Sequence, residues 1–183
     1  MDRTEALAAV RARVQNENLI KHMLATEAIM RALARRLGQD EEEWGLTGLI
    51  HDIDVELTEG QPQDHSKVGA DLVKQMGASE PVCHAVLSHN EAHGVPCETL
   101  LDKALFCADP LTGLITAGAL IRQDRKLAGL TVDSLKKRFK EKRFAAGASR
   151  ENIASCEQIG LSLDEFLSLG LEAMKGIAPE LGL

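Results

Sequence analysis

The chain has 183 residues, of which 44% are hydrophobic and 27% charged, and its formal net charge is −7. This length and composition are typical of a globular domain that can bury a large core without disulfides or structural metals. The negative charge and the shortage of aromatic residues, with no tyrosine and one tryptophan, argue against nucleic acid as a partner.

The sequence also argues against a membrane or secreted protein. Its first residues, MDRTEALAAVRARVQ, lack the apolar segment of a secretory signal. The most apolar region, 103–121, is interrupted by Asp109-Pro110, so we expect no membrane span. The four cysteines contain no CxxC pair, which is typical of reduced thiols. We therefore expect a cytoplasmic protein.

Helical patterns follow one another along the whole chain. Asp40 is a suitable N-cap for the third helix, and Ser162-Leu-Asp-Glu165 matches the capping-box pattern before the last one. No segment alternates as a strand would. The sequence therefore predicts an all-α fold of seven to nine helices in a single domain, 1–183. The expected helical ranges are 5–14, 18–37, 40–51, 65–76, 79–89, 98–121, 132–142, 150–159 and 162–176.

Histidines and aspartates near the helix ends are the most unusual feature of the sequence. His51-Asp52 directly follows the apolar stretch 46–50, and Asp109 lies within KALFCADPLTGLI. A buried carboxylate needs a partner, and a metal cation is one that would suit. His51 and Asp52 would diverge by about 100° inside a regular helix, so they can converge on one ion only where the helix ends.

Five short motifs at these positions resemble the HD-domain superfamily of metal-dependent phosphohydrolases. They are KHMLATEAIMRALA, LTGLIHDID, DHSKVGADLV, AVLSHNE and LDKALFCADPLTGLI, and the resemblance covers about residues 18–122. It implies a helical bundle with a metal centre, to which about residues 123–183 add a C-terminal helical extension.

The resemblance also implies a set of metal ligands. One ion would be held by His22, His51, Asp52 and Asp109, and a second by His65 and His89, with Asp52 bridging the two and acting in catalysis. Imidazole and carboxylate ligands suit iron, manganese, cobalt, nickel or zinc, so we expect one or two such divalent ions.

For the substrate we expect a phosphate ester or anhydride of a nucleotide or small phosphorylated metabolite. Nine Lys/Arg against three Asp/Glu between residues 122 and 143 form a basic region, which is either a solvated helix face or a source of phosphate contacts. The candidates for phosphate contact are Lys67, Lys103, Arg122 and Lys126, with Arg125 beside them.

Two other functions fit the same ligands. One is an HD-type di-iron oxygenase, and the other is a non-catalytic nucleotide-sensing module.

Among the remaining residues, Asp54, Asp64 and Glu91 either hold histidine tautomers or are simple surface acids. We expect His84 to be structural, and His93 to lie at the rim of the site or on the surface rather than to be a ligand. HNEAH at 89–93 lacks the glutamate directly after the first histidine that a zinc protease requires.

Overall fold

A computed structural model describes all residues 1–183, and its regular elements are all helical. The helices are α1 (Arg3–Arg13), α2 (Glu17–Leu37), α3 (Glu41–Ile50), α4 (Lys67–Gln75), α5 (Glu80–Ser88), α6 (Leu100–Leu120), α7 (Val132–Lys140), α8 (Arg150–Ala154), α9 (Leu163–Gly176) and α10 (Ala178–Leu181), with two 3-10 segments, η1 (Glu91–His93) and η2 (Ser155–Ile159). The all-α prediction is confirmed. The structure has ten α-helices, one more than the seven to nine that the sequence predicts. The unpredicted helix is α10, whose four residues are too few to show a helical period.

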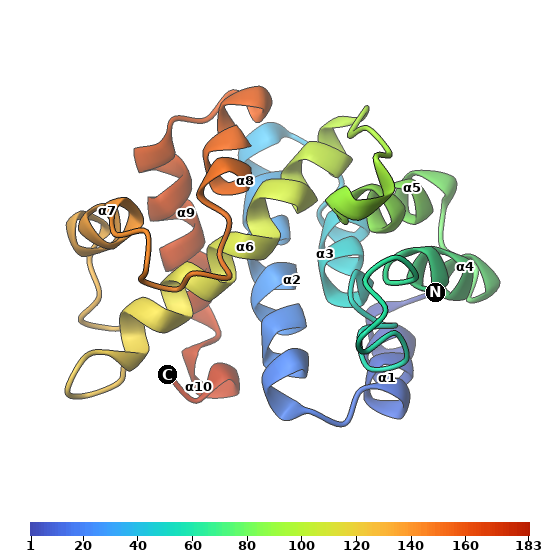
Figure 1. Ribbon diagram of the computed structural model, residues 1–183, viewed down its shortest axis with the longest axis horizontal. Coiled ribbons are helices and arrows are strands. Elements are labelled where there is room, and N and C mark those ends of the chain that lie inside the picture. Colours follow the sequence, from blue (N-terminus) through green and yellow to red (C-terminus); the bar gives the residue numbers. More distant parts are fainter.

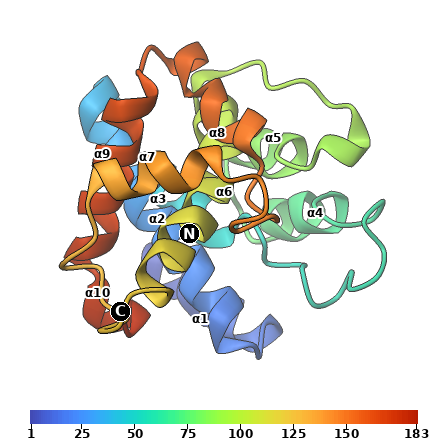
Figure 2. The same cartoon turned by 60° about the vertical axis from the view of Figure 1, so that its left-hand side comes forward.

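Two long helices, α2 and α6, form the centre of the bundle. Helix α6 crosses α2, and α2 also packs against α3 and α9 (Figure 1). Helices α1, α3, α4 and α5 lie on one side of α2, whereas α7, α8 and α9 lie on the other (Figure 1). Turning the molecule by 60° shows the segment between α7 and α8 beside α6 (Figure 2). Segments distant in sequence therefore meet along α2 and α6.

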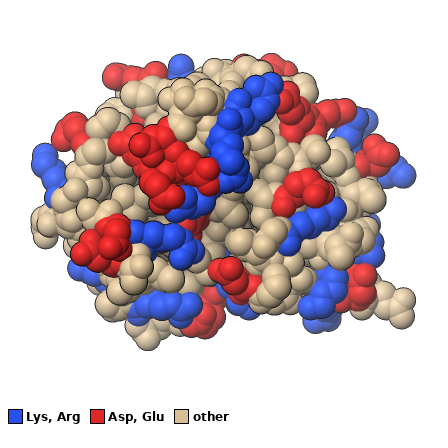
Figure 3. All heavy atoms as spheres, turned by 180° about the vertical axis from the view of Figure 1, so that it is seen from behind, with Lys and Arg blue, Asp and Glu red and all other residues tan.

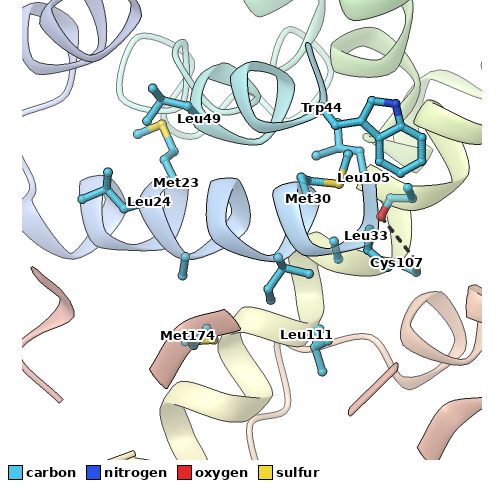
Figure 4. Close-up of a cluster of buried hydrophobic side chains, with 14 of the residues drawn as sticks. Met23, Leu24, Met30, Leu33, Trp44, Leu49, Leu105, Cys107, Leu111 and Met174 are labelled. Atoms are coloured by element: carbon cyan, nitrogen blue, oxygen red, sulfur yellow. Dashed lines mark hydrogen bonds between the residues drawn. The ribbon is translucent and has the colours of Figure 1, made fainter. Parts of the chain in front are cut away.

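The hydrophobic core surrounds α2. Figure 4 shows Met23 and Met30 of α2 among side chains of α3, α6 and α9, including Leu49, Leu105 and Met174. The 42 buried hydrophobic residues form one cluster, to which the C-terminal region contributes as well. Each large side chain that is fully buried stabilises the fold by about 1.5–3 kcal/mol relative to exposure.

Gly48 lets α3 approach α2 closely. A Cβ atom at this position would lie 2.9 Å from backbone atoms of Glu27 and Thr26. At the start of α3, Asp40 Oδ1 accepts hydrogen bonds from Glu42 N and Glu43 N at 2.9 and 3.0 Å, as its cap position predicts. Helix α3 is thus fixed at its start and pressed against α2 near its end.

The capping box predicted at Ser162 forms only in half. Ser162 Oγ accepts from Glu165 N at 3.2 Å, but the Glu165 carboxylate accepts from Arg36 Nε of α2 at 2.7 Å instead of returning to the cap. A contact with another helix therefore replaces the local one. In α6, Pro110 lies within a continuous helix rather than interrupting it.

Ion pairs link neighbouring helices at the surface. Arg31 of α2 contacts Glu27 and Glu42 at 3.0 and 2.7 Å, and Figure 3 shows acidic and basic side chains adjoining one another on the face behind that of Figure 1. No helix combines the length and apolar composition needed to cross a bilayer.

Candidate metal centre

Six side chains from five parts of the chain converge beside α2 and α6. His22 comes from α2, and Asp109 comes from α6. His51 caps the C-terminal end of α3 and is followed by Asp52, His89 caps the C-terminal end of α5, and His65 lies two residues before α4. The fold thus brings together all six residues that the sequence predicts as metal ligands.

The end of α3 places His51 and Asp52 on the same side. Regular helix ends at Ile50, and the chain continues in turns in which Ile53 N donates to Ile50 O at 3.1 Å and Val55 N to Asp52 O at 3.0 Å. His51 Nε2 consequently lies 3.5 Å from Asp52 Oδ2. The expected convergence at a helix end is present.

Three residues and one oxygen of Asp52 form the first half of the cluster. His22 Nε2 lies 3.2 Å from His51 Nε2 and 3.1 Å from Asp109 Oδ1. Asp52 Oδ2 lies 3.5 Å from the Nε2 atoms of His22 and His51 alike.

The second half of the cluster uses the other oxygen of Asp52. Asp52 Oδ1 lies 3.4 Å from His65 Nε2 and 3.3 Å from His89 Nε2. Each oxygen of this one carboxylate therefore faces a different pair of imidazoles.

These distances fit bound cations. Ligand atoms about 2.0–2.2 Å from one ion lie roughly 3.0–3.5 Å from each other. All the separations above fall in this range, and the distance from His51 Nε2 to Asp109 Oδ1 is slightly longer at 3.8 Å. His22, His51 and Asp109 form one group whose atoms could hold an ion, and His51, Asp52 and His89 form another. The donor set of nitrogen and carboxylate oxygen suits divalent transition metals.

The outer nitrogen of every imidazole in the cluster has a partner. The Nδ1 atoms of His51 and His89 lie 2.9 and 2.6 Å from the carbonyl oxygens of Gly48 and Val86. A carbonyl only accepts, so these Nδ1 atoms donate, and a neutral ring then turns the Nε2 lone pair toward the cluster.

His22 reaches the same tautomer through a hydroxyl group. Its Nδ1 lies 2.8 Å from Thr112 Oγ1, which itself donates to Asp109 O at 2.8 Å. Because that donation uses the hydroxyl proton, His22 Nδ1 must donate to Thr112. Thr112 follows Asp109 by three residues in α6, so one turn of helix supplies both a possible ligand and a residue that orients another.

Asp54 orients His65. It is fully buried, and its Oδ1 lies 3.1 Å from His65 Nδ1, while its Oδ2 accepts from Ser66 N and Gly69 N at 2.8 Å each. Ser66 adopts a left-handed conformation with φ 68°, and a Cβ atom at Gly69 would lie 2.9 Å from Asp54 Oδ1. The motif DHSKVGA thus folds around this carboxylate.

The electrostatics of the cluster favour protons or cations between its ligands. Burial lowers the pKa of His22, but hydrogen bonds to Asp109 and Asp52 outweigh it and raise that pKa to about 10. His65 behaves alike: burial lowers its pKa, and Asp52 and Asp54 raise it to about 10. For Asp109, burial raises the pKa, yet His22 and His51 hold it well below its usual range. A divalent cation can replace these protons.

None of the four candidate phosphate contacts lines the hollow that opens onto the cluster. Lys67 is exposed at the start of α4, and Lys103 lies near the start of α6. Arg122 follows Asp109 by 13 residues, about 20 Å along the helix direction, and its Nη2 pairs with Asp124 Oδ2 at 3.0 Å. Lys126 Nζ lies 3.4 Å from Gly182 O.

The remaining acids and histidines have separate positions. His84 Nδ1 contacts Asp102 Oδ2 at 2.9 Å, outside the cluster. His93 Nε2 donates to His65 O, with the atoms 2.5 Å apart, and so supports the segment that carries a candidate ligand. Glu91 lines the hollow that opens onto the cluster, whereas Asp64 is exposed and makes no side-chain hydrogen bond.

A hollow of about 440 Å³, here called the mouth, opens onto the cluster. Asp52, His65, His89 and Asp109 line it together with Asn90, and Ser149 and Asn152 add polar groups from the start of α8. The sequence analysis did not identify Ser149 and Asn152. They lie about 40 residues after Asp109, and no pattern in the sequence indicates that this part of the chain returns to the mouth.

A family comparison agrees with this geometry. The family model described as HD domain matches residues 19–114, which include all six residues of the cluster. The chain belongs to the HD-domain family. This is a superfamily of metal-dependent hydrolases whose domains bind divalent metals, and the chain is a domain of the metal-dependent phosphohydrolase type.

The chain is also similar to proteins named ribonuclease Y. It is 32% identical over 98 residues to that of Oleidesulfovibrio alaskensis, covering 54% of this chain and 18% of the relative. It is 31% identical over 97 residues to that of Syntrophobacter fumaroxidans, covering 53% of this chain and 18% of the relative. It is 28% identical over 137 residues to that of Sulfurovum sp., covering 75% of this chain and 25% of the relative. The chain spans about a fifth of the length of these relatives. No solved structure matches it.

These relatives overturn one prediction. The net charge of −7 and the few aromatic residues argued against nucleic acid, and the expected partner was a small phosphorylated molecule, yet the relatives are named for the cleavage of RNA. The error is physical: net charge describes the average surface, whereas a metal centre can attract a phosphate locally. The prediction that nucleic acid is excluded is wrong.

Proposed function

We propose that this domain hydrolyses phosphodiester bonds in RNA at a centre of two divalent cations. The observation that carries the proposal is the position of Asp52, whose two carboxylate oxygens face separate histidine pairs at 3.3–3.5 Å. One cation would be held by His22, His51, Asp52 and Asp109, and the other by Asp52, His65 and His89.

Two such cations would polarise a phosphoryl oxygen and lower the pKa of a water molecule so that it can attack phosphorus. In the reaction, the water oxygen forms a bond to phosphorus, the bond from phosphorus to the leaving ribose oxygen breaks, and a proton passes to that oxygen. The chain contributes the arrangement of the ligands. Asp52 fixes the separation of the two ligand sets, and the four engaged Nδ1 atoms keep each Nε2 directed inward.

RNA as the substrate is supported by the named relatives and by the openness of the mouth. The Asp109 side chain is 31% exposed and that of Asp52 13%, so a phosphate in a chain can approach both. No lysine or arginine lines the mouth, and Glu91 does. Attraction of a polyanion would therefore come from the cations, and we expect RNA to bind only the metal-loaded domain.

The test is a comparison of wild type with Asp52→Ala. Protein purified without chelator is analysed for manganese, iron, cobalt, nickel and zinc, and then assayed on a fluorescent single-stranded RNA. We expect close to two ions per wild-type chain. In Asp52→Ala we expect the loss of most metal and a fall in RNA cleavage of at least about a hundredfold, because one carboxylate serves both ligand sets.

Asp71→Ala is the matched control, since Asp71 is exposed on α4 and makes no ion pair. It should keep both metal content and activity. Asp52→Ala with full metal content and full activity would contradict the bridging role. Wild-type protein that holds two ions and cleaves no RNA would contradict the substrate, and oxygen consumption by an iron-loaded form would redirect the assignment to an oxygenase.

A further inference from the structure

A second hollow, here called the side pocket, adjoins the cluster between α2, α6 and the segment before α8. Its volume is about 640 Å³, within the range of small-molecule sites. His22 and Thr112 form its wall on the metal side, and Gly147 lines both this pocket and the mouth. The side pocket therefore borders the cluster at His22, the mouth borders it at four other candidate ligands, and Gly147 lies between the two hollows.

Small residues form much of the side pocket. On α6 these are Gly113, Thr116 and Ala117, and facing them is the run 145–148, Ala-Ala-Gly-Ala. This run lies beside α6 in Figure 2, and a Cβ atom at Gly113 would be 3.8 Å from Ala148 Cβ. Walls built from methyl groups and backbone suit a flat, largely apolar group.

Lys21 gives the side pocket a positive charge. It lines the pocket next to His22, is partly buried, and has no acidic partner within 4 Å. Its Nζ lies near Gly182, because a Cβ atom there would be 3.3 Å away, and Lys126 Nζ approaches Gly182 O at 3.4 Å. Two ammonium groups thus approach Gly182. A partly buried cation without a partner favours an anionic ligand.

We propose that the side pocket holds the nucleoside on one side of the scissile phosphate and that Lys21 binds the next phosphate of the strand. This rests on the proposed function and deepens it. A phosphate monoester carries one organic group, whereas a diester carries two, and here a separate hollow lies on each side of the cluster. The geometry therefore selects a diester within a strand, with one nucleoside in the side pocket and the other at the polar mouth.

The first experiment separates the pocket from the metals. Binding of adenosine monophosphate and of inorganic phosphate to the manganese-loaded protein is measured by calorimetry. Both ligands offer a phosphate to the metals, but only the nucleotide can fill the side pocket. We expect the nucleotide to bind at least about tenfold more tightly, which corresponds to about 1.4 kcal/mol.

Gly113→Leu tests the position of the nucleoside. Gly113 is exposed in α6 and lines the pocket, and an added Cβ atom would meet only Ala148 within 4 Å, so a leucine there would occupy part of the pocket. We expect it to weaken nucleotide binding by about tenfold and to leave phosphate binding and metal content within about twofold. Gly176→Leu is the matched control, because Gly176 at the end of α9 has no neighbour within 4 Å and lies outside the pocket.

The outcomes distinguish the two proposals. If inorganic phosphate does not bind the metal-loaded protein, the proposed function fails and this inference with it. If phosphate binds but the nucleotide binds no better, or if Gly113→Leu leaves nucleotide binding unchanged, the side pocket does not hold the nucleoside and the hydrolase proposal survives.

Lys21→Met tests the neighbouring phosphate. Adenosine 3′,5′-bisphosphate should bind the wild type more tightly than the monophosphate by about tenfold, because a charge-assisted contact is added. Lys21→Met should remove this advantage while it preserves the affinity for the monophosphate. Lys74→Met, which removes an exposed and unpaired lysine of α4, is the control and should still bind the bisphosphate about tenfold more tightly than the monophosphate. If the bisphosphate binds wild type and Lys21→Met with the same preference over the monophosphate, Lys21 does not bind the second phosphate.

Discussion

Two histidines of the cluster owe their direction to a helix end. His51 and His89 are the C-cap residues of α3 and α5, and each donates Nδ1–H to the carbonyl three residues before it. Carbonyls at a helix C-terminus lack partners within the helix, so the imidazole satisfies one and is fixed by it. The sequence could predict the six candidate ligands because they stand in spaced motifs. It named Asp54 as one of three candidates for holding a histidine tautomer, but it could not single out Asp54 or its partner His65, because that contact depends on the turn at Ser66.

At the residue scale, metal affinity should depend on pH in an unusual range. The ordinary pKa of histidine is near 6.5, and that of His22 is raised to about 10 in the metal-free protein. Because a metal needs the unprotonated nitrogen, affinity should rise as the pH increases to about 10 instead of levelling off near 7. Competition with a chelator of known affinity across pH 6–10 measures this.

The sign for folding is the opposite. A raised pKa means that the proton stabilises the folded metal-free protein, so this contribution is complete below pH 6.5 and is lost as the pH rises toward about 10. Affinity that levels off near pH 7 would show that Asp109 and Asp52 do not hold a proton on His22.

At the scale of elements, the approach of α3 to α2 sets the distance between His51 and His22. The sequence predicted both helices and the N-cap of α3, because these signals are local. It did not predict their closeness, because Gly48 looks like any helical glycine until its neighbours Glu27 and Thr26 are known. The C-terminal ends of α3 and α5 both reach the cluster, and the partial negative charge of a helix C-terminus favours a cation there.

Gly48→Ala should therefore disturb the cluster through the backbone. The new methyl group would lie 2.9 Å from the backbone of Glu27, so α3 must move away from α2. We expect a loss of about 1–3 kcal/mol in the free energy of unfolding and weaker metal binding. Thermal unfolding with elemental analysis measures both.

Gly176→Ala provides the comparison. This residue lies in α9 with open space around it, so alanine should stabilise the helix by up to about 1 kcal/mol and leave the metal content unchanged. If Gly48→Ala behaves in the same way, the close approach of the two helices does not position His51.

At the scale of the whole molecule, folding and metal binding are expected to be separable. The core of 42 hydrophobic residues contains none of the six residues in the cluster. The sequence predicted a helical extension after residue 122 but no role for it. In the structure, this extension packs on α2 and α6, and its 145–148 segment forms part of the side pocket. Such long-range packing leaves no local pattern in the sequence.

Removal of metal should consequently lower the stability without unfolding the chain. At a free metal concentration of about 100 times Kd, binding stabilises by about 2.7 kcal/mol per site, so the loss of both ions should lower Tm by about 10–20 °C for a chain of this size. Far-UV circular dichroism with and without a chelator should show this shift and an unchanged helix content at 25 °C. Loss of helix content on chelation would mean that the ions are needed for the fold itself.

The position of the Asp52 carboxylate between the two histidine pairs has a consequence for the magnetic properties of bound metal ions. Because one oxygen is turned toward each histidine pair, the O–C–O bonds of this carboxylate would couple the electron spins of two bound Mn²⁺ ions. In a fully manganese-loaded sample, we expect the electron spins to couple antiferromagnetically, so that the six-line resonance of isolated Mn²⁺ weakens on cooling and returns when half of the ions are withdrawn.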